Sequence, residues 1–489
     1  MSLTQAEVHT LERIRQVNSS DGSLAIHARA THLLEQDATI LRKPHPSKDD
    51  IELAELSRRG SRSQDAQERT NVAEGTPGAT DGVDVNSPEV KLTAWLQYAS
   101  LCFTLFLAGW NDGTTGPLLP RMQENYHVGY AVVSLIFVLN TVGFVAGAIS
   151  NVYFAEKIGL GRTMLLGAIS QLIGYALMAP APPFPVLAIG YVFNGFGISL
   201  QDAGANGYVA SLKDNANVKM GILHAIYGIG AFIAPLSATQ FRSLPRWSFQ
   251  YLISLGIAVV NIVFLHFVFR GKRLEECLAE IGQTRTDATS SSANSDENKY
   301  RQIFRLREVH FLAAFICLYV GVEVTVGGWS VSYIEVVRGG GNNSGYVSAG
   351  FFGGLTVGRI ALLWLNKKIG ERNAVFLYAI LALGLEFVIW FVPSLIGGAL
   401  AVSFVGVFLG PIYPLAINHT AKILPHSLLT GSIGWIAGVG QAGSAIVPFI
   451  TGAIASKAGI ASLQPVLIGL MSAMFAVWVI VPRQARHID

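Results

Sequence analysis

Long apolar segments separated by short polar ones dominate the chain from residue 93 onward. Many of these segments reach the roughly 20 residues that a helix needs to cross about 30 Å of hydrocarbon. Gly, Ala and Ser recur in them, which suits close contact between helices in lipid better than a soluble core. The pattern predicts about twelve membrane-spanning helices, near residues 93–115, 130–154, 163–180, 184–210, 218–241, 248–269, 309–328, 344–365, 373–392, 395–420, 428–455 and 461–481.

The composition also indicates a protein that crosses a membrane several times. Apolar residues make up 51% of the chain and charged residues 14%, which argues against a soluble all-helical protein. Most Lys and Arg residues of the predicted loops fall on the side of the two termini, so both termini are expected in the cytoplasm. They do not gather into one patch, so nucleic-acid binding is not expected. Because no short apolar segment follows Met1, we expect the first span to act as an internal signal.

The polar segments divide the chain into five parts. Residues 1–90 are rich in Ser, Asp, Arg and Gly, which predicts a disordered cytoplasmic tail that regulates rather than transports. Residues 271–308 form a second polar stretch that separates six spans from six, as expected for a cytoplasmic linker. The remaining parts are an N-terminal lobe at 91–270, a C-terminal lobe at 309–482 and a short cytoplasmic C-terminus at 483–489.

The two halves of the chain repeat features at one spacing. Asp112 lies in the first span, and Glu323 follows in the seventh span roughly 211 residues later. Offsets of roughly 211 or 212 residues also relate Lys157-Ile158-Gly159 to Lys368-Ile369-Gly370 and Asn206 to Asn418. We therefore predict an all-α membrane protein with two pseudo-symmetric six-helix lobes, and carboxylates inside both halves indicate a transporter.

Three carboxylates inside the predicted spans are candidates for proton coupling: Asp112, Asp202 and Glu323. A charged, unpaired carboxylate near the middle of a membrane costs several kcal/mol, so the group must be neutral, paired or in contact with water. Such a group can hold a proton in one conformation and release it in another. The alternative for Asp112 and Asp202 is a structural hydrogen bond between helices, which we expect for Glu386. Glu323 could instead lie in water near the outer end of its span. Arg359 needs a carboxylate or carbonyl partner unless its side chain extends to the cytoplasmic face.

Amide and aromatic side chains recur in the same spans and could line a central site. Amides hydrogen-bond hydroxyl groups, and flat rings stack on sugar faces or hold an apolar natural product. Some amides, especially Asn194 and Asn206, could instead tie helices together. The predicted substrate-binding residues are Asn111, Asp112, Gln201, Asn206, Tyr227, Trp329, Tyr413, Asn418, Trp435 and Gln441.

Several kinds of site have no support in the sequence. His, Cys and acidic residues do not cluster at metal-ligand spacing, so we predict no metal site and no cofactor. A Gly-Lys-Ser or Gly-Lys-Thr phosphate loop is also missing, which argues against ATP-driven pumping, and an enzyme is not expected. Cys102, Cys277 and Cys317 lie in two spans and the linker, where no disulfide is expected. Asn342-Asn343-Ser344 matches a glycosylation acceptor in a loop that the charge rule places outside.

Twelve spans in two halves around a central cytoplasmic loop resemble the major facilitator superfamily. Asn111-Asp112 and the run from Gly195 to Asn206 resemble its fucose-proton symporter branch. Further matches to that branch are Gly321-Val322-Glu323 before Trp329-Ser330, Gly358-Arg359, and Tyr413-Pro414. The arrangement of the spans and the extra tail resemble the fungal members.

The resemblance implies roles for particular residues. In the symporters, the acidic residue of span one is implicated in substrate binding and proton coupling, and that of span four in proton coupling. Asp112 and Asp202 match these two positions, while Glu323 stands where the branch usually has a neutral amide. The superfamily signature between spans two and three is present in altered form. The predicted gating residues are Glu156, Arg162 and Arg359.

These observations predict a secondary active transporter that moves a small organic solute, sugar-like by resemblance, by rocking two lobes around a central site. The expected partners are that solute, protons and the lipid bilayer, and the expected location is the plasma membrane. Export of a fungal secondary metabolite is an alternative, because aromatic and aliphatic residues would line its path equally well. A nutrient receptor that binds without transporting is a third interpretation.

Overall fold

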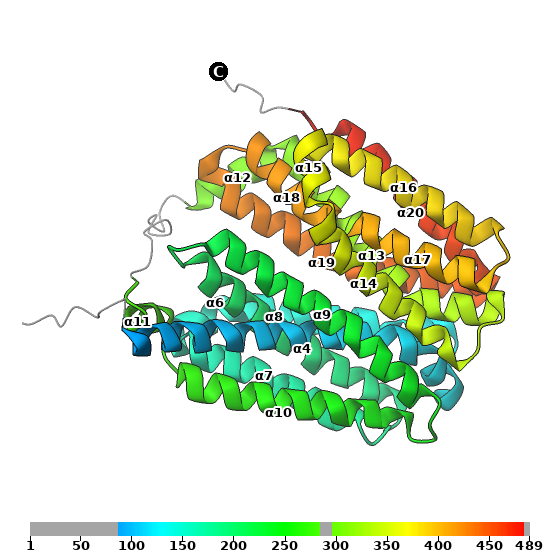
Figure 1. The fold of residues 1–489 in the computed structure, drawn as a ribbon, viewed down its shortest axis with the longest axis horizontal. Coiled ribbons are helices and arrows are strands. Elements are labelled where there is room, and N and C mark those ends of the chain that lie inside the picture. Colours follow the sequence, from blue (N-terminus) through cyan, green and yellow to red (C-terminus); the bar gives the residue numbers. More distant parts are fainter. Residues whose placement is uncertain (1–86, 284–295, 484–489) are drawn as a thin grey trace, which may run out of the picture. The chain divides into compact units, whose positions relative to one another are not determined.

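The computed structural model describes residues 87–283 and 296–483, and its regular elements are helices (Figure 1). The N-terminal lobe contains α4 (Pro88–Tyr126), α5 (Tyr130–Val133), α6 (Leu135–Ile158), α7 (Leu160–Met178), α8 (Phe184–Ala210), α9 (Ala216–Arg242), η1 (Trp247–Phe249) and α10 (Gln250–Phe269). The C-terminal lobe contains α13 (Arg307–Arg338), η3 (Asn342–Gly345), α14 (Tyr346–Ala361), α15 (Leu363–Ile369), α16 (Glu371–Phe391), α17 (Leu395–Leu409), α18 (Ile412–Ile423), α19 (His426–Ala458), η4 (Ile460–Ser462) and α20 (Leu463–Ile480). Between them come α11 (Leu274–Glu280) and α12 (Asp296–Arg305). Nearly all of the predicted tail lies outside the described residues.

The helices account for the twelve predicted spans. In the described part of the chain, ten segments are long and apolar enough to cross a membrane. An eleventh is the pair Asn342–Ala361 and Leu363–Ile369, which is bent by 53°. The remaining one is α7, whose 19 residues include the polar side chains of Arg162 and Gln171. Each lobe therefore has six spans, and the predicted all-α membrane fold is confirmed.

Two of the predicted spans end ten or more residues before their helices do. The first was expected to end near residue 115, but α4 continues through Pro117 and Pro120 to Tyr126. The seventh was expected to end near residue 328, but α13 continues to Arg338. Polar and small residues lower the hydropathy of both extensions, although much of each is buried inside the protein. Asp112 is therefore well inside its helix rather than at the end of a span.

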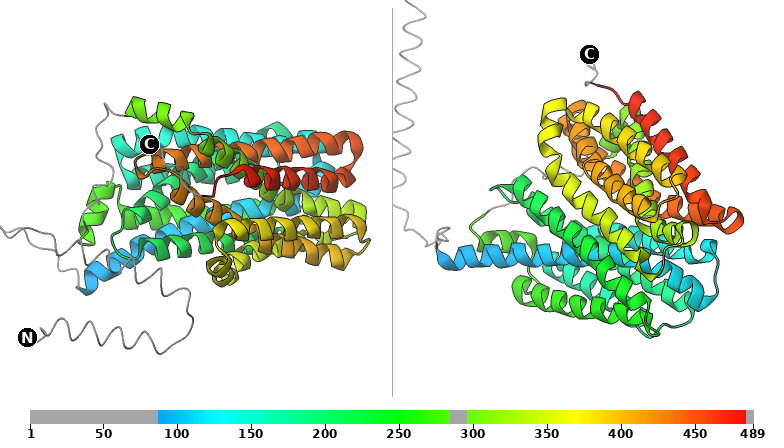
Figure 2. Two further views of the ribbon diagram at one scale, coloured as in Figure 1. Left: turned by 90° about the horizontal axis from the view of Figure 1, so that it is seen from above. Right: turned by 45° about the vertical axis from the view of Figure 1, so that its right-hand side comes forward.

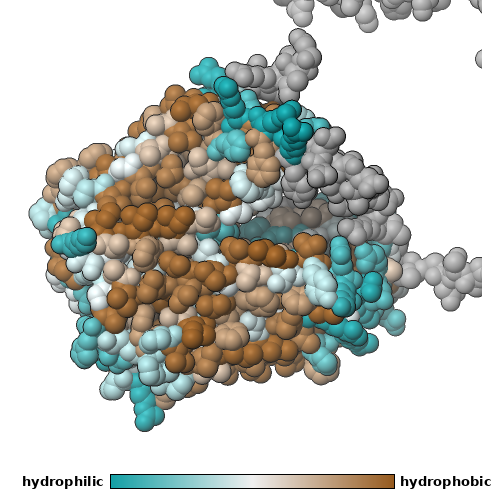
Figure 3. Space-filling model, turned by 180° about the vertical axis from the view of Figure 1, so that it is seen from behind, coloured by the Kyte–Doolittle hydropathy of each residue, from teal (hydrophilic) through white to brown (hydrophobic). Residues whose placement is uncertain are grey.

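Apolar side chains cover the flanks of both lobes, as a membrane environment requires (Figure 3). Large exposed examples are Ile149, Phe267, Trp364 and Ile396. Hydrophilic side chains gather mainly at the ends of the helices (Figure 3). The protein is an integral membrane protein that crosses the bilayer many times.

The linker helices lie at one end of the helical bundle, which we call the linker side (Figures 1 and 2). The short helix α11 is attached to the N-terminal lobe, because Nε2 of Gln97 on α4 donates to Oε2 of Glu280 at 3.2 Å. Cys277 of α11 is buried against the same lobe, and burial raises the pKa of its thiol to about 11. A thiol with this pKa is rarely ionised at neutral pH, so Cys277 packs rather than reacts.

The second linker helix, α12, is attached to the C-terminal lobe instead. Ile303 is buried in the core of that lobe, and the ring of Phe304 lies 4.8 Å from the ring of Trp435 on α19. The two ends of the linker are therefore each fixed to a different lobe.

The opposite end of the bundle, which we call the far side, is closed by contacts between the lobes. The indole of Trp329 on α13 lies 5.8 Å from the ring of Tyr130 and 6.2 Å from that of Phe137. Gly116 of α4 approaches the backbone of Gly327 so closely that any side chain would collide with it. On the linker side the space-filling view shows a recess between the lobes (Figure 3). The structure therefore represents a conformation that is closed on the far side and open toward the linker side.

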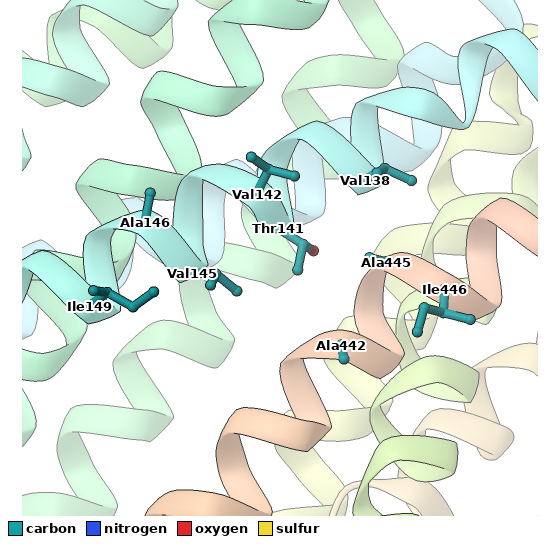
Figure 4. A pocket seen from close by; sticks show the side chains of 9 residues that line it. All are labelled: Val138, Thr141, Val142, Val145, Ala146, Ile149, Ala442, Ala445 and Ile446. Carbon is teal, nitrogen blue, oxygen red and sulfur yellow. The ribbon is translucent and has the colours of Figure 1, made fainter.

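An apolar groove of about 420 Å³ runs between α6 and α19, one helix from each lobe (Figure 4). Its lining residues are Val138, Thr141, Val142, Val145, Ala146, Ile149, Ala442, Ala445 and Ile446. Thr141, one of the lining residues, hydrogen-bonds with Ser444 of α19 across the seam at 3.3 Å. Lipid tails are as apolar as these side chains, so a chain lying in the groove would gain little over bulk lipid. We regard the groove as part of the membrane-facing surface, and it lies apart from the polar residues described next.

Candidate functional site

Asp112 is held inside the N-terminal lobe by a hydroxyl from the neighbouring helix. The Tyr227 hydroxyl on α9 donates to Asp112 Oδ2 at 2.6 Å, and Nδ2 of Asn111 lies 3.4 Å from Oδ1. The close approach of α4 and α9 depends on Gly109, whose missing side chain leaves room for the backbone of Tyr227. Asp112 remains partly exposed, so it has access to water in this open conformation.

Glu323 and Arg359 form an ion pair within the C-terminal lobe. Nη2 of Arg359 on α14 lies 3.7 Å from Oε1 of Glu323 on α13, and its Nε donates to the carbonyl oxygen of Gly410 at 3.3 Å. The guanidinium of Arg359 thus has a carboxylate and a carbonyl partner inside the protein, as a buried guanidinium needs. Its side chain does not have to extend to the cytoplasmic face to find a partner. The gating role of Arg359 stays a prediction.

The acid of the first lobe and the ion pair of the second lie close to each other. Asp112 and Glu323 interact electrostatically across the seam, and Tyr227 interacts with both Glu323 and Arg359. Gly228 of α9, directly after Tyr227, packs against Thr356 of α14, about one turn before Arg359. This arrangement brings three ionisable groups from two lobes to one location, where a solute between the lobes would meet them.

Asp202 lies on α8, which also borders the space between the lobes. Its Oδ1 accepts a hydrogen bond from Nδ2 of Asn206 at 2.9 Å, one helical turn away. It interacts electrostatically with Asp112 and with Tyr413 of α18. Asp202, Asn206 and Tyr413 are partly exposed, and Asn418 is exposed. Asp202, Asn206 and Tyr413 therefore form, with Asp112, a polar group that is partly accessible in this conformation. Asn418 follows five residues after Tyr413 on α18, and its substrate-binding role stays a prediction.

Other predicted substrate-binding residues lie elsewhere in this conformation. Gln201 is buried inside the N-terminal lobe, where its Nε2 donates to the carbonyl oxygen of Met164 at 3.3 Å. Trp329 is 0% exposed and donates to the carbonyl oxygen of Pro448 at the far-side seam. Trp435 lies beside α12 near the linker side. Gln441 accepts a hydrogen bond from Ser444 at 3.4 Å. None of these four shares a hydrogen bond with the group around Asp112 in the part of the chain that the structure describes.

Glu156 and Arg162 lie at the linker-side ends of α6 and α7, where both are exposed. The tight turn between these helices uses Gly159, whose φ of 84° favours glycine. A cavity of about 430 Å³ beside this turn is lined by Glu156, Arg273 and Glu275, among others. The position suits residues that meet the opposite lobe when the linker side closes, and the gating role of Glu156 and Arg162 stays a prediction.

An ion pair that was not predicted from the sequence connects the two lobes on the far side. Arg242, at the end of α9, forms an ion pair with Glu335 of α13 across the two lobes. Arg242 is only 4% exposed. Both residues lie beyond the predicted ends of their spans, so no pattern along the chain indicated that they meet. Gln240 and Tyr346 add a hydrogen bond between the lobes nearby.

Two six-helix lobes around a polar centre match a known family model, that of the Major Facilitator Superfamily, over residues 101–447. The chain belongs to the Major Facilitator Superfamily. It is thus a multi-pass membrane transporter of a small solute. The family that the sequence resembled is confirmed.

Curated relatives of this superfamily member span most of its length. Bypass of stop codon protein 6 from Saccharomyces cerevisiae is 28% identical over 407 residues, which cover 78% of this chain and 82% of that protein. The glucose/galactose transporter of Brucella abortus is 24% identical, with 75% of this chain and 90% of that protein covered. A fungal relative agrees with the predicted fungal branch.

Solved structures share the fold of this superfamily member. The Escherichia coli fucose:proton symporter matches with a TM-score of 0.56 at 16% identity, covering 79% of this chain and 98% of that one. A D-xylose-proton symporter matches with a TM-score of 0.65 at 12% identity, covering 80% and 98%. At these identities the matches establish the fold that the two lobes share.

Glu386 is a buried acid of the transporter that lies away from the group around Asp112. It is 1% exposed on α16, and neither of its carboxylate oxygens accepts a well-aligned hydrogen bond from the described residues. Nearby groups are Gln464 of α20 and Tyr333 of α13. A charge at such a position would cost several kcal/mol, so we expect Glu386 to stay neutral through the transport cycle.

Replacing Glu386 by glutamine should therefore leave transport rate and proton coupling unchanged, because a neutral amide has nearly the same shape as a neutral acid. Glu386→Lys should prevent stable folding, since it buries a permanent charge. Uptake by purified, reconstituted protein and its thermal midpoint test both variants. Loss of coupling in a well-folded Glu386→Gln protein would show that this acid carries protons.

Proposed function

We propose that this transporter is a proton-coupled sugar symporter, and that Asp112 is its central substrate and proton site. The observation that supports the proposal is that Asp112, held in the N-terminal lobe, interacts electrostatically with Glu323 of the other lobe, which is itself paired with Arg359. An acid of one lobe that interacts with a charge of the other lobe meets a different environment in each conformation. Proton binding there can therefore be linked to the rocking motion.

The three charges suggest how a proton would change the balance between conformations. With Asp112 ionised, its charge and that of Glu323 repel each other across the seam, while the Tyr227 hydroxyl donates to Asp112. With Asp112 protonated, Glu323 and Arg359 form a neutral pair, and no unpaired charge remains between the lobes. Enclosing this neutral arrangement away from water costs less free energy than enclosing an unpaired charge. The protein with protonated Asp112 is therefore the form that closes around the solute.

A sugar fits the polar groups near Asp112. Acceptors and donors for hydroxyl groups come from Asp112, Asn206 and Tyr227, and the ring of Tyr413 offers an apolar face. The Brucella relative is named a glucose/galactose transporter, and the structural neighbours are named fucose and xylose symporters. These names support a monosaccharide as the first substrate to test.

We place the linker side in the cytoplasm and the protein in the plasma membrane. The basic residues near the linker support this orientation, among them Arg270, Lys272, Arg273 and Arg307. In this orientation the structure is open to the cytoplasm.

Uptake of radiolabelled glucose, galactose, fucose and xylose into vesicles that contain the purified protein tests the proposal. We expect accumulation against a gradient when the outside is acidic, with acidification of the lumen reported by a trapped pH dye. Sugar binding without flux would favour a receptor. Protein-dependent efflux of an apolar metabolite, with no sugar flux, would favour an exporter.

Asp202→Asn is expected to abolish uphill accumulation but to leave some downhill exchange, because a permanently neutral side chain mimics the protonated state and cannot carry a proton. Asn206→Asp is not a suitable control, because it adds a charge beside Asp202. Asp214→Asn is suitable, since this exposed acid lies beyond α8. Normal concentrative uptake by Asp202→Asn would remove Asp202 from the coupling role.

A further inference from the structure

Asn111 connects Asp112 to the interior of the N-terminal lobe. Its Oδ1 accepts a hydrogen bond from the Tyr175 hydroxyl on α7 at 3.3 Å and another from Nδ2 of Asn194 on α8 at 3.2 Å. Tyr175 and Asn194 are both fully enclosed, and Asn111 itself is 6% exposed. The amide oxygen of Asn111 is thus occupied by two donors from its own lobe, and it is not available to a solute.

These two donors determine which way the Asn111 amide faces. An amide rotated by 180° would set its own NH2 group against the NH2 group of Asn194. In the observed orientation Nδ2 of Asn111 faces Asp112 Oδ1 at 3.4 Å, while the Tyr227 hydroxyl reaches Oδ2. Both carboxylate oxygens of Asp112 therefore face hydrogen-bond donors, and one of those donors is oriented from inside the lobe.

Space for this arrangement comes from a glycine. A side chain at Gly174 of α7 would approach Asn194 Oδ1 to 2.5 Å and the carbonyl oxygen of Gly190 to 2.7 Å. Helices α7 and α8 are thus close enough for Tyr175 and Asn194 to reach the same oxygen atom of α4.

We infer that Tyr175 and Asn194 are positioning residues for Asp112, which act through Asn111 to set the pH range in which this acid exchanges its proton. The inference rests on the proposed coupling role of Asp112. It also changes the role of Asn111 from a substrate ligand to the connection between these residues and the acid. The Tyr175 hydroxyl lies two hydrogen bonds away from Asp112. Its removal should then change the pH at which Asp112 exchanges its proton without changing any contact with the solute.

Infrared spectroscopy of the purified protein tests this without a transported solute. The C=O stretch of protonated Asp112 is identified as the band that disappears in Asp112→Asn, and its intensity is followed over pH. In Tyr175→Phe, which keeps the ring and loses the hydroxyl, the midpoint of this titration should move by about half to one pH unit, the size of one hydrogen bond. The pH profile of sugar uptake should move by the same amount, with little change in KM.

Tyr208→Phe is the matched control. Tyr208 is a buried tyrosine of the same lobe, and its hydroxyl also donates to an amide oxygen of α4, that of Gln97, at 2.6 Å. It makes no hydrogen bond to Asn111 or Asp112. We expect no change in the Asp112 titration for this variant, although its thermal midpoint should fall as in Tyr175→Phe.

The possible outcomes separate the inference from the proposed function. An unchanged Asp112 midpoint in Tyr175→Phe, or an equal shift in Tyr208→Phe, would overturn the inference alone. Absence of any titrating Asp112 band would overturn the coupling role, and the inference with it. If Tyr175→Phe fails to fold, the same titration of Asn194→Ser tests the inference. This substitution removes the second donor to Asn111 and places a smaller side chain at position 194.

Discussion

Asp112→Asn is expected to abolish uphill sugar accumulation while exchange of labelled for unlabelled sugar continues. The amide keeps the shape of the acid and can still hydrogen-bond, but it cannot release a proton. Asp112→Ala also removes the acceptor, so sugar affinity should fall further than in Asp112→Asn, by roughly 1 to 3 kcal/mol. Equilibrium binding over a range of pH measures both effects, and both variants should show a weaker linkage between sugar and protons.

Glu124→Gln serves as the control for Asp112. Glu124 is an exposed acid of the same helix, paired with Arg121 at 3.0 Å on the far side. Its replacement removes one charge from α4 without touching the space between the lobes, so uptake and its pH dependence should be unchanged. Wild-type affinity and pH dependence in both Asp112 variants would reduce this residue to a helix-packing role.

Glu335→Gln is expected to open the far side. The substitution leaves the buried Arg242 without a carboxylate partner when the far side is closed. When the far side opens, water can solvate Arg242, so the open conformation becomes relatively more stable. Loss of one partner of a buried pair costs about 3–5 kcal/mol. Glu335 is 22% exposed, so we expect about 2–3 kcal/mol, a roughly 30- to 150-fold shift in the conformational equilibrium. Uptake should slow, because the return to this conformation is disfavoured.

Electron–electron distance measurements test the shift directly. Spin labels at Glu124 and Lys457, one on the far side of each lobe, should move apart in Glu335→Gln when the three native cysteines are replaced. The combined variant Arg242→Glu and Glu335→Arg restores an ion pair, and it should recover the wild-type distance distribution. An unchanged distribution in Glu335→Gln, measured on active protein, would mean that the pair does not hold the far side closed.

The ionisable groups of the site could be located from the sequence because they stand out in apolar spans. An acid inside a hydrophobic segment is costly, so Asp112, Asp202 and Glu323 are identifiable from the hydropathy pattern alone. For Arg359 the sequence left two alternatives open, a partner inside the protein or extension to the cytoplasmic face, and it did not name a partner. The repeat spacing predicted that Asp112 and Glu323 belong to opposite lobes.

The direction of each side chain could not be predicted in the same way. A helix in lipid is apolar on every face, so periodicity does not tell which face points to the centre. Trp329, Gln201 and Asn111 therefore look alike in the sequence, yet the first closes a seam and the other two lie inside a lobe. Arg242 was missed because polar residues ended the predicted span before it, although the helix continues.

The attachment of α11 to one lobe and α12 to the other has a mechanical consequence. The hydrogen bond from Gln97 to Glu280 and the ring contact between Phe304 and Trp435 each lie between a linker helix and its own lobe. Rocking of the lobes as rigid bodies therefore breaks neither contact. The choice between the two open states then rests with the contacts that the lobes make with each other.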